Sequence, residues 1–136
     1  MELELKKECL DTYEPGEPQT LTQEETAETI VPDYCPDIAR IISAEGVVCL
    51  HGGTEQDGVT GTVRVTVLYT PENESGVRAL EFAMPFSAHG EGLAGCAHVV
   101  VETEIELLES RMLNPRQIFT SCTLVTHLAG CRTVCL

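Results

Sequence analysis

The chain of 136 residues has the length of a single domain. Eight basic residues against 22 acidic ones give a formal net charge of −14, which repels phosphate backbones and anionic lipid headgroups. We therefore expect neither nucleic acid nor a membrane surface as a partner. The sequence contains no apolar run of about 18 residues, so we expect no membrane insertion.

The first ten residues, MELELKKECL, are charged where a signal peptide would need an apolar stretch. We therefore expect synthesis in the cytoplasm without a signal peptide. Leu3 and Leu5 alternate with charged residues, which predicts a short edge strand. Residues 11–28 are polar and contain two prolines and a glycine, so residues 1–28 are predicted to be an N-terminal strand followed by a polar loop.

Residues 29–48, TIVPDYCPDIARIISAEGVV, carry the one helical signal. Pro36 suits the first position of a helix, and Asp37 would face the positive end of its dipole. Ile38, Ile41 and Ile42 have the i, i+3, i+4 spacing of an apolar helix face. These residues predict one short α-helix over about residues 36–44 that covers a core.

The polar residues of the same stretch admit a second interpretation. Their charges and prolines could form a recognition surface for another protein rather than a cover for the core. The candidate residues of this interaction surface are Pro32, Asp33, Asp37 and Arg40.

The rest of the chain alternates with the period of β-strands. Strands are predicted over residues 59–69 and 77–86 with a turn at PENESG, and over 97–110 and 117–128 with a turn at Asn114–Arg116. Val99, Val101, Thr103, Ile105 and Leu107 should share one face of the third strand. We expect a mainly β domain over residues 1–136, an antiparallel β-sandwich or strongly curved sheet with a C-terminal cysteine-containing tail at 129–136.

Seven cysteines are many for a cytosolic chain, and the odd number leaves at least one without a partner in the monomer. Cys49 and Cys122 lie in apolar stretches and are expected to be buried. The candidates for intermolecular disulfides are Cys9, Cys131, Cys135 and Cys35.

Motifs for other chemistry lack the context that they need. Gly90, Gly92 and Gly95 satisfy GxGxxG, but a strand-like acidic segment follows where a helix should receive the phosphates. Metal sets could be drawn from Cys96 with His98, or from Cys122, His127, Cys131 and Cys135, yet no CxxC occurs. A nucleophile built on Cys35 and Asp33 has no supporting signature. We therefore expect no cofactor and no enzymatic activity.

Four segments in order, TIVPDYCPDIARIISAEGVV, GTVRVTVLYTPE, AMPFSAHGEG and MLNPRQI, together resemble the SPOCS domain of spore-forming Firmicutes. The resemblance covers roughly Leu3 to Leu128. In a clostridial spore-morphogenesis protein this domain accompanies a LysM peptidoglycan-binding module and takes part in coat assembly. No LysM module is present here, and Cys131 and Cys135 lie beyond the usual end of the domain.

The resemblance implies a non-enzymatic protein-interaction domain made in the mother cell and placed in the spore envelope. A structural subunit that forms a homo-oligomer or polymer with intermolecular disulfides is the leading hypothesis. The alternatives are a monomeric adaptor that recruits another spore coat protein, and a structural metal-binding module.

Overall fold

The computed structural model describes residues 11–51, 58–92 and 98–135, and in these ranges the chain forms seven β-strands and no helix. No helix long and apolar enough to cross a membrane is found in them. The strands are β1 (Asp11–Pro15), β2 (Gln19–Ile30), β3 (Ile38–Leu50), β4 (Gly58–Pro71), β5 (Arg78–His89), β6 (His98–Asn114) and β7 (Gln117–Cys135).

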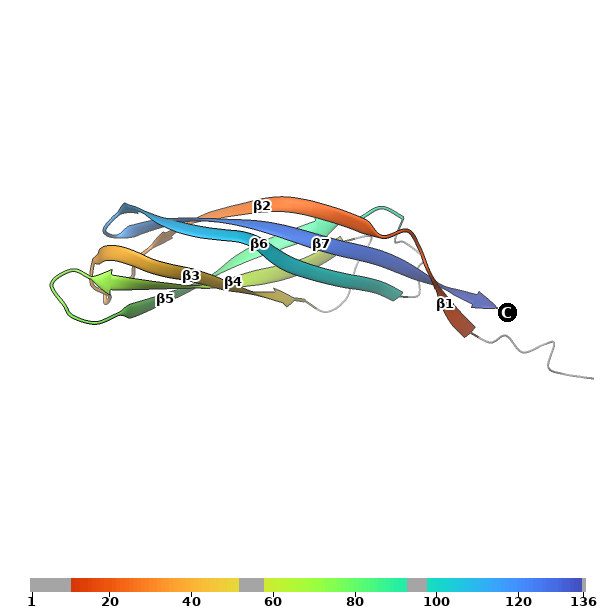
Figure 1. Cartoon of the computed structure of the whole chain (residues 1–136), viewed down its shortest axis with the longest axis horizontal. Coiled ribbons are helices and arrows are strands. Elements are labelled where there is room, and N and C mark those ends of the chain that lie inside the picture. Colours follow the sequence, from red (N-terminus) through yellow and green to blue (C-terminus); the bar gives the residue numbers. More distant parts are fainter. Residues whose placement is uncertain (1–10, 52–57, 93–97, 136) are drawn as a thin grey trace, which may run out of the picture.

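The strands form two antiparallel sheets that lie face to face (Figure 1). In sheet A, β7 is central: β6 pairs with one of its edges, and β1 and β2 pair in series with the other. Sheet B has the order β3-β4-β5. β3 packs against β6 and β2 against β5 along the two sides of the sandwich. The predicted mainly β fold and its sandwich packing are therefore confirmed.

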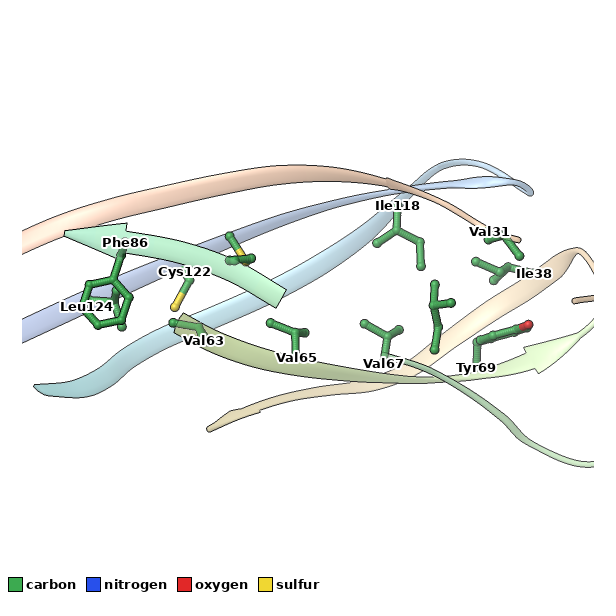
Figure 2. Close-up of a cluster of buried hydrophobic side chains, with 12 residues drawn as sticks. Val31, Ile38, Val63, Val65, Val67, Tyr69, Phe86, Ile118, Cys122 and Leu124 are labelled. Atoms are coloured by element: carbon green, nitrogen blue, oxygen red, sulfur yellow. The ribbon is translucent and has the colours of Figure 1, made fainter. Parts of the chain in front are cut away.

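The core lies between the central strands of the two sheets (Figure 2). The inward face of β4 contributes Val63, Val65, Val67 and Tyr69, each at most 1% exposed. Opposite them β7 contributes residues at every second position, as its period predicts. These residues of β7 are Ile118, Cys122 and Leu124, all fully buried.

The predicted helix over residues 36–44 is wrong, because these residues lead into and form the first half of β3. Two bulges explain the misleading pattern: Ala39 and Ile42 are extra residues in the ladder with β4. The inward positions therefore fall at Ile38, Ile41 and Ala44, three residues apart, which imitates the spacing of a helix face. Ile42 is pushed outward and is 45% exposed.

A third bulge, at Glu106 in β6, changes another prediction. Leu107 does not share the inward face of Val99 and Ile105: it is 51% exposed, and Leu108 packs against the core in its place. The predicted turns at 71–76 and 114–116 do separate β4 from β5 and β6 from β7.

The two ends of the chain also differ from prediction. The polar loop expected within residues 11–28 is instead β1 and most of β2, because β2 alternates half-buried and exposed positions along its whole length. The expected tail at 129–136 continues β7 as far as Cys135. The edge strand predicted over residues 1–10 lies outside the described residues.

Gly61 makes room for an aromatic ring inside the sandwich. It lies opposite Phe86 in the β4–β5 ladder, and both face inward. A Cβ at position 61 would stand 2.7 Å from Phe86 Cζ and 2.8 Å from the carbonyl oxygen of Cys49. Because backbone cannot yield as a flexible side chain can, only glycine fits at this position.

We predict that Gly61→Val lowers the free energy of unfolding by about 1–3 kcal/mol, the usual range for an overpacked core. Urea denaturation followed by circular dichroism measures this loss. Thr60→Val, on the exposed face of the same strand, is the matched control and should change stability by no more than about 0.5 kcal/mol. Equal effects of the two changes would contradict the packing role of Gly61.

Candidate interaction surface

Three connections meet at the same end of the sandwich (Figure 1). They are the crossover from sheet A to sheet B at Val31–Asp37, the β4–β5 loop at Glu72–Val77 and the two-residue β6–β7 turn at Pro115–Arg116. We call this region the loop end. It contains three of the four predicted interaction residues, Pro32, Asp33 and Asp37.

The crossover Val31–Asp37 has more hydrogen-bond acceptors than donors. Pro32 and Pro36 lack an N–H, so the segment has seven carbonyl groups and only five backbone donors. Carbonyl groups at a partly buried position cost free energy unless a donor reaches them. The segment therefore needs donors from another part of the chain.

Arg116 supplies those donors from the β6–β7 turn. Its Nη1 donates to the carbonyl of Cys35 (2.7 Å) and to Oδ1 of Asp37 (3.0 Å). Its Nη2 donates to the carbonyls of Val31 (2.9 Å) and Pro32 (2.8 Å). The guanidinium group has the planar fork of donors that such an arrangement requires, which a lysine lacks.

Backbone hydrogen bonds also join the crossover to the β6–β7 turn, one near each end of the crossover. The amide of Val31 donates to the carbonyl of Arg116 (2.8 Å), and the amide of Ile38 donates to the carbonyl of Pro115 (2.9 Å). Asn114 Oδ1 accepts from the amide of Arg116 and shapes the turn. The crossover is therefore held to the β6–β7 turn by backbone and side-chain bonds together.

Tyr69 contacts the crossover from the core side. Its ring is 1% exposed in the core, and its hydroxyl donates to the carbonyl of Pro36 (3.3 Å). Burial raises the pKa of Tyr69 above its ordinary value. The neutral hydroxyl is thus the form that the fold favours.

The tip of the crossover, by contrast, faces solvent. Tyr34 is 87% exposed and the side chain of Asp33 is fully exposed, with a carboxylate oxygen 3.9 Å from Arg116 Nη2. Ile30, immediately before the crossover, is 72% exposed. An exposed aromatic side chain on a fixed loop is a common anchor in protein interfaces, so Tyr34, Ile30 and Asp33 form the candidate contact patch.

The four residues predicted as one surface therefore have different places. Pro32 and Asp37 bind Arg116 and hold the crossover, whereas Asp33 reaches solvent. Arg40 lies beyond the crossover on β3, exposed on the outer face of sheet B, and its carbonyl accepts from Thr70. Sequence reasoning missed Arg116 and Tyr34, although the surplus of carbonyls created by two prolines was a usable signal.

The cysteines whose side chains are described are free thiols. Cys35 and Cys131 are half-buried: Cys35 packs against the core beside the crossover, and Cys131 faces outward on β7 opposite His98. Cys135 continues β7 opposite Asp11, and Cys9 lies outside the described residues. Burial, and secondly the nearby carboxylate of Glu25, raise the pKa of the fully buried Cys122 thiol.

The metal sets considered from sequence are not assembled in the described residues. Cys122 faces the core, whereas His127 and Cys131 lie on the opposite, outer face of β7, so the alternation of the strand separates them. Cys96 lies outside the described residues. His51 directly follows β3, and His89, His98 and His127 lie on β5, β6 and β7, each well along its strand from the loop end where Cys35 lies. The topology therefore gives Cys35 no imidazole as a base.

A hollow of about 530 Å³ on the outer face of sheet B is the other notable surface feature. Cys49, Thr62, Arg64 and Glu81 are among its lining residues. His51 Nε2 is 3.0 Å from the hydroxyl of Thr62. The hydrogen-bond partner of this imidazole is therefore a threonine.

Comparison with protein-family models, with curated proteins and with solved structures finds no match for this chain.

We predict that Arg116→Met lowers the free energy of unfolding by about 2–4 kcal/mol, because it leaves several carbonyl groups and a carboxylate without their donor. Arg116→Lys should recover only part of this loss. Arg64→Met, an exposed arginine of β4, is the control and should change stability by at most about 0.5 kcal/mol. Urea denaturation of the three variants makes the comparison, and a neutral Arg116→Met would contradict the bonding described.

The thiols should also differ in reactivity. We predict that iodoacetamide at pH 8 modifies Cys131 before Cys122, since burial raises the pKa of Cys122 and blocks access to it. Peptide mass spectrometry after timed quenching gives the order. Addition of urea should remove the difference, and equal rates in the native protein would be the contrary result.

Proposed function

We propose that this protein is a non-enzymatic structural subunit of the spore envelope that self-associates into a layer or fibre. The resemblance of residues 29–48, 61–72, 83–92 and 112–118 to the SPOCS domain supports the spore envelope as its place. Self-association is supported by one observation above all: Cys131 is a free, half-buried thiol on the outer face of β7.

A thiol in this position is available for a disulfide with a neighbouring copy. Two thiols would lose two protons and two electrons to an oxidant, such as the disulfide of a small thiol, and form one S–S bond between chains. An odd number of cysteines leaves at least one for this purpose even if others pair within the chain. Cys9 and Cys135 remain further candidates, whereas Cys35 is a poorer one because it packs against the core.

The alternative function is a monomeric adaptor that recruits another coat protein. The exposure of Tyr34 on a crossover held by Arg116 favours it, since a fixed loop loses little conformational entropy on binding. In this case the partner would cover Tyr34, Ile30 and Asp33 at the loop end.

Electron microscopy and light scattering of the purified chain separate the two functions. We expect particles larger than a monomer, and non-reducing gels of oxidised material should show covalent multimers that a reductant removes. Cys131→Ser should reduce the covalent multimers without abolishing assembly, with Cys122→Ser as the control for a buried thiol. A chain that stays monomeric at every concentration would contradict self-association.

For the adaptor function, Tyr34→Ala combined with Asp33→Asn, which adds no positive charge beside Arg116, should remove one partner from a pull-down out of sporulating cells. These two changes leave the contacts of Arg116 with the carbonyl groups and with Asp37 in place, so the fold is kept. Arg40→Ala, on the neighbouring strand, is the control. Retention of every partner by the double variant would exclude the adaptor function at this surface.

A further inference from the structure

β1 is attached to the rest of the fold in an unusual way. Its five residues pair with Cys131–Cys135 of β7, while β2 pairs with residues 117–128 along the same edge. β7 is the only described strand against which β1 packs extensively. Figure 1 shows the β1 end of sheet A reaching beyond sheet B. β1 is therefore held by one β-ladder, and sheet B does not cover it.

The link between β1 and β2 is short and exposed. It consists of Gly16, Glu17 and Pro18, all exposed, and follows Pro15. The amide of Gly16 donates to the carbonyl of Gly130, one of the two residues of β7 that separate the two ladders. A three-residue link that follows one proline and ends in another has few conformations, and short constrained hinges favour exchange of the attached element between copies.

Three other edges of the described sheets carry features that oppose the addition of a strand, whereas the free edge of β2 is regular along its 12 residues. β6 carries the acidic residues Glu102 and Glu104 and is bulged at Glu106. β3 has two bulges, and β5 contains Pro85, which lacks the N–H that an added strand would need. The edge of β7 that receives β1 shows no register shift along its ladder with β1.

We propose that β1 is an exchange strand, so that β1 of one copy pairs with Cys131–Cys135 of β7 in the next. This inference rests on the proposed self-association and specifies its contact. The ladder that β1 makes is the same whether its β7 belongs to its own chain or to a neighbour, so exchange sacrifices no pairing. Each copy gives one strand and receives one, which generates open chains or closed rings of copies.

The register of the ladder supplies a direct test. Asp11 is the register partner of the native Cys135, and Cα atoms of facing residues in an antiparallel ladder lie within the range that a disulfide can span, so Asp11→Cys is the test variant. The change is made in a chain whose Cys9, Cys49 and Cys131 are replaced by serine, and oxidised glutathione is the oxidant. Exchange predicts a ladder of covalent multimers on a non-reducing gel, linked through residues 11 and 135 in peptide mass spectrometry.

Thr12→Cys in the same background is the matched control, because residue 12 lies opposite Val134 and has no thiol across from it. It should give no comparable ladder. Circular dichroism establishes that both variants are folded. A disulfide between residues 11 and 135 confined to the monomer, or free thiols at both positions, overturns the exchange.

Light scattering of the same samples under reducing conditions separates this inference from the function on which it rests. Assemblies larger than a monomer together with a disulfide confined to one chain would mean that copies associate through another surface. A monomer with an internal disulfide would overturn both the exchange and self-association. Multimers that are linked through residues 11 and 135 support both.

Discussion

The arrangement at the loop end depends on one constraint, the surplus of carbonyl groups in the crossover between the two sheets. Pro32 and Pro36 set the extended path of this segment but remove two donors from it. The guanidinium group of Arg116 replaces them and binds three carbonyl groups and the carboxylate of Asp37. The hydroxyl of Tyr69 donates to the carbonyl of Pro36, and the amide of Glu72 to that of Asp37. Every carbonyl of the crossover outside its exposed tip is therefore hydrogen-bonded.

This arrangement divides the crossover into a half-buried support and an exposed tip. The residues that contact Arg116 hold the path of the chain, and Tyr34 and Asp33 between them extend into solvent. A surface built in this way is presented in one conformation before any partner arrives, which lowers the entropic cost of a contact. The contacts of Arg116 thus stabilise the crossover and also fix the position of its exposed tip.

Strand positions were largely predictable from the sequence, because one face of each central strand is buried and the period of two is plain. Val63 to Tyr69 and Ile118 to Leu124 are clear instances. The predicted inward positions were wrong at the bulges, because each extra residue in β3 or β6 shifts the inward face by one position. Leu107 and Ile42 are exposed for this reason.

The candidate site was less predictable than the fold. Asp33 was predicted and does face solvent, but the role of Arg116 depends on carbonyl groups 81 to 85 residues away in the chain. A sequence specifies side chains and their spacing, whereas the acceptors of Arg116 are mostly backbone carbonyl groups, which every residue has. Only the pairing of β2 with β7 brings the two segments together.

The position of β7 at the centre of sheet A also governs the order in which the protein can be completed. β1, β2 and β6 each require β7 as their hydrogen-bonding neighbour, and all three leave the ribosome before it. Sheet B, whose strands follow one another directly, can form while synthesis continues. The newly made chain must therefore carry the apolar side chains of β2 and β6 without their partner strand until β7 emerges, a period in which a chaperone or a neighbouring nascent chain has access to them.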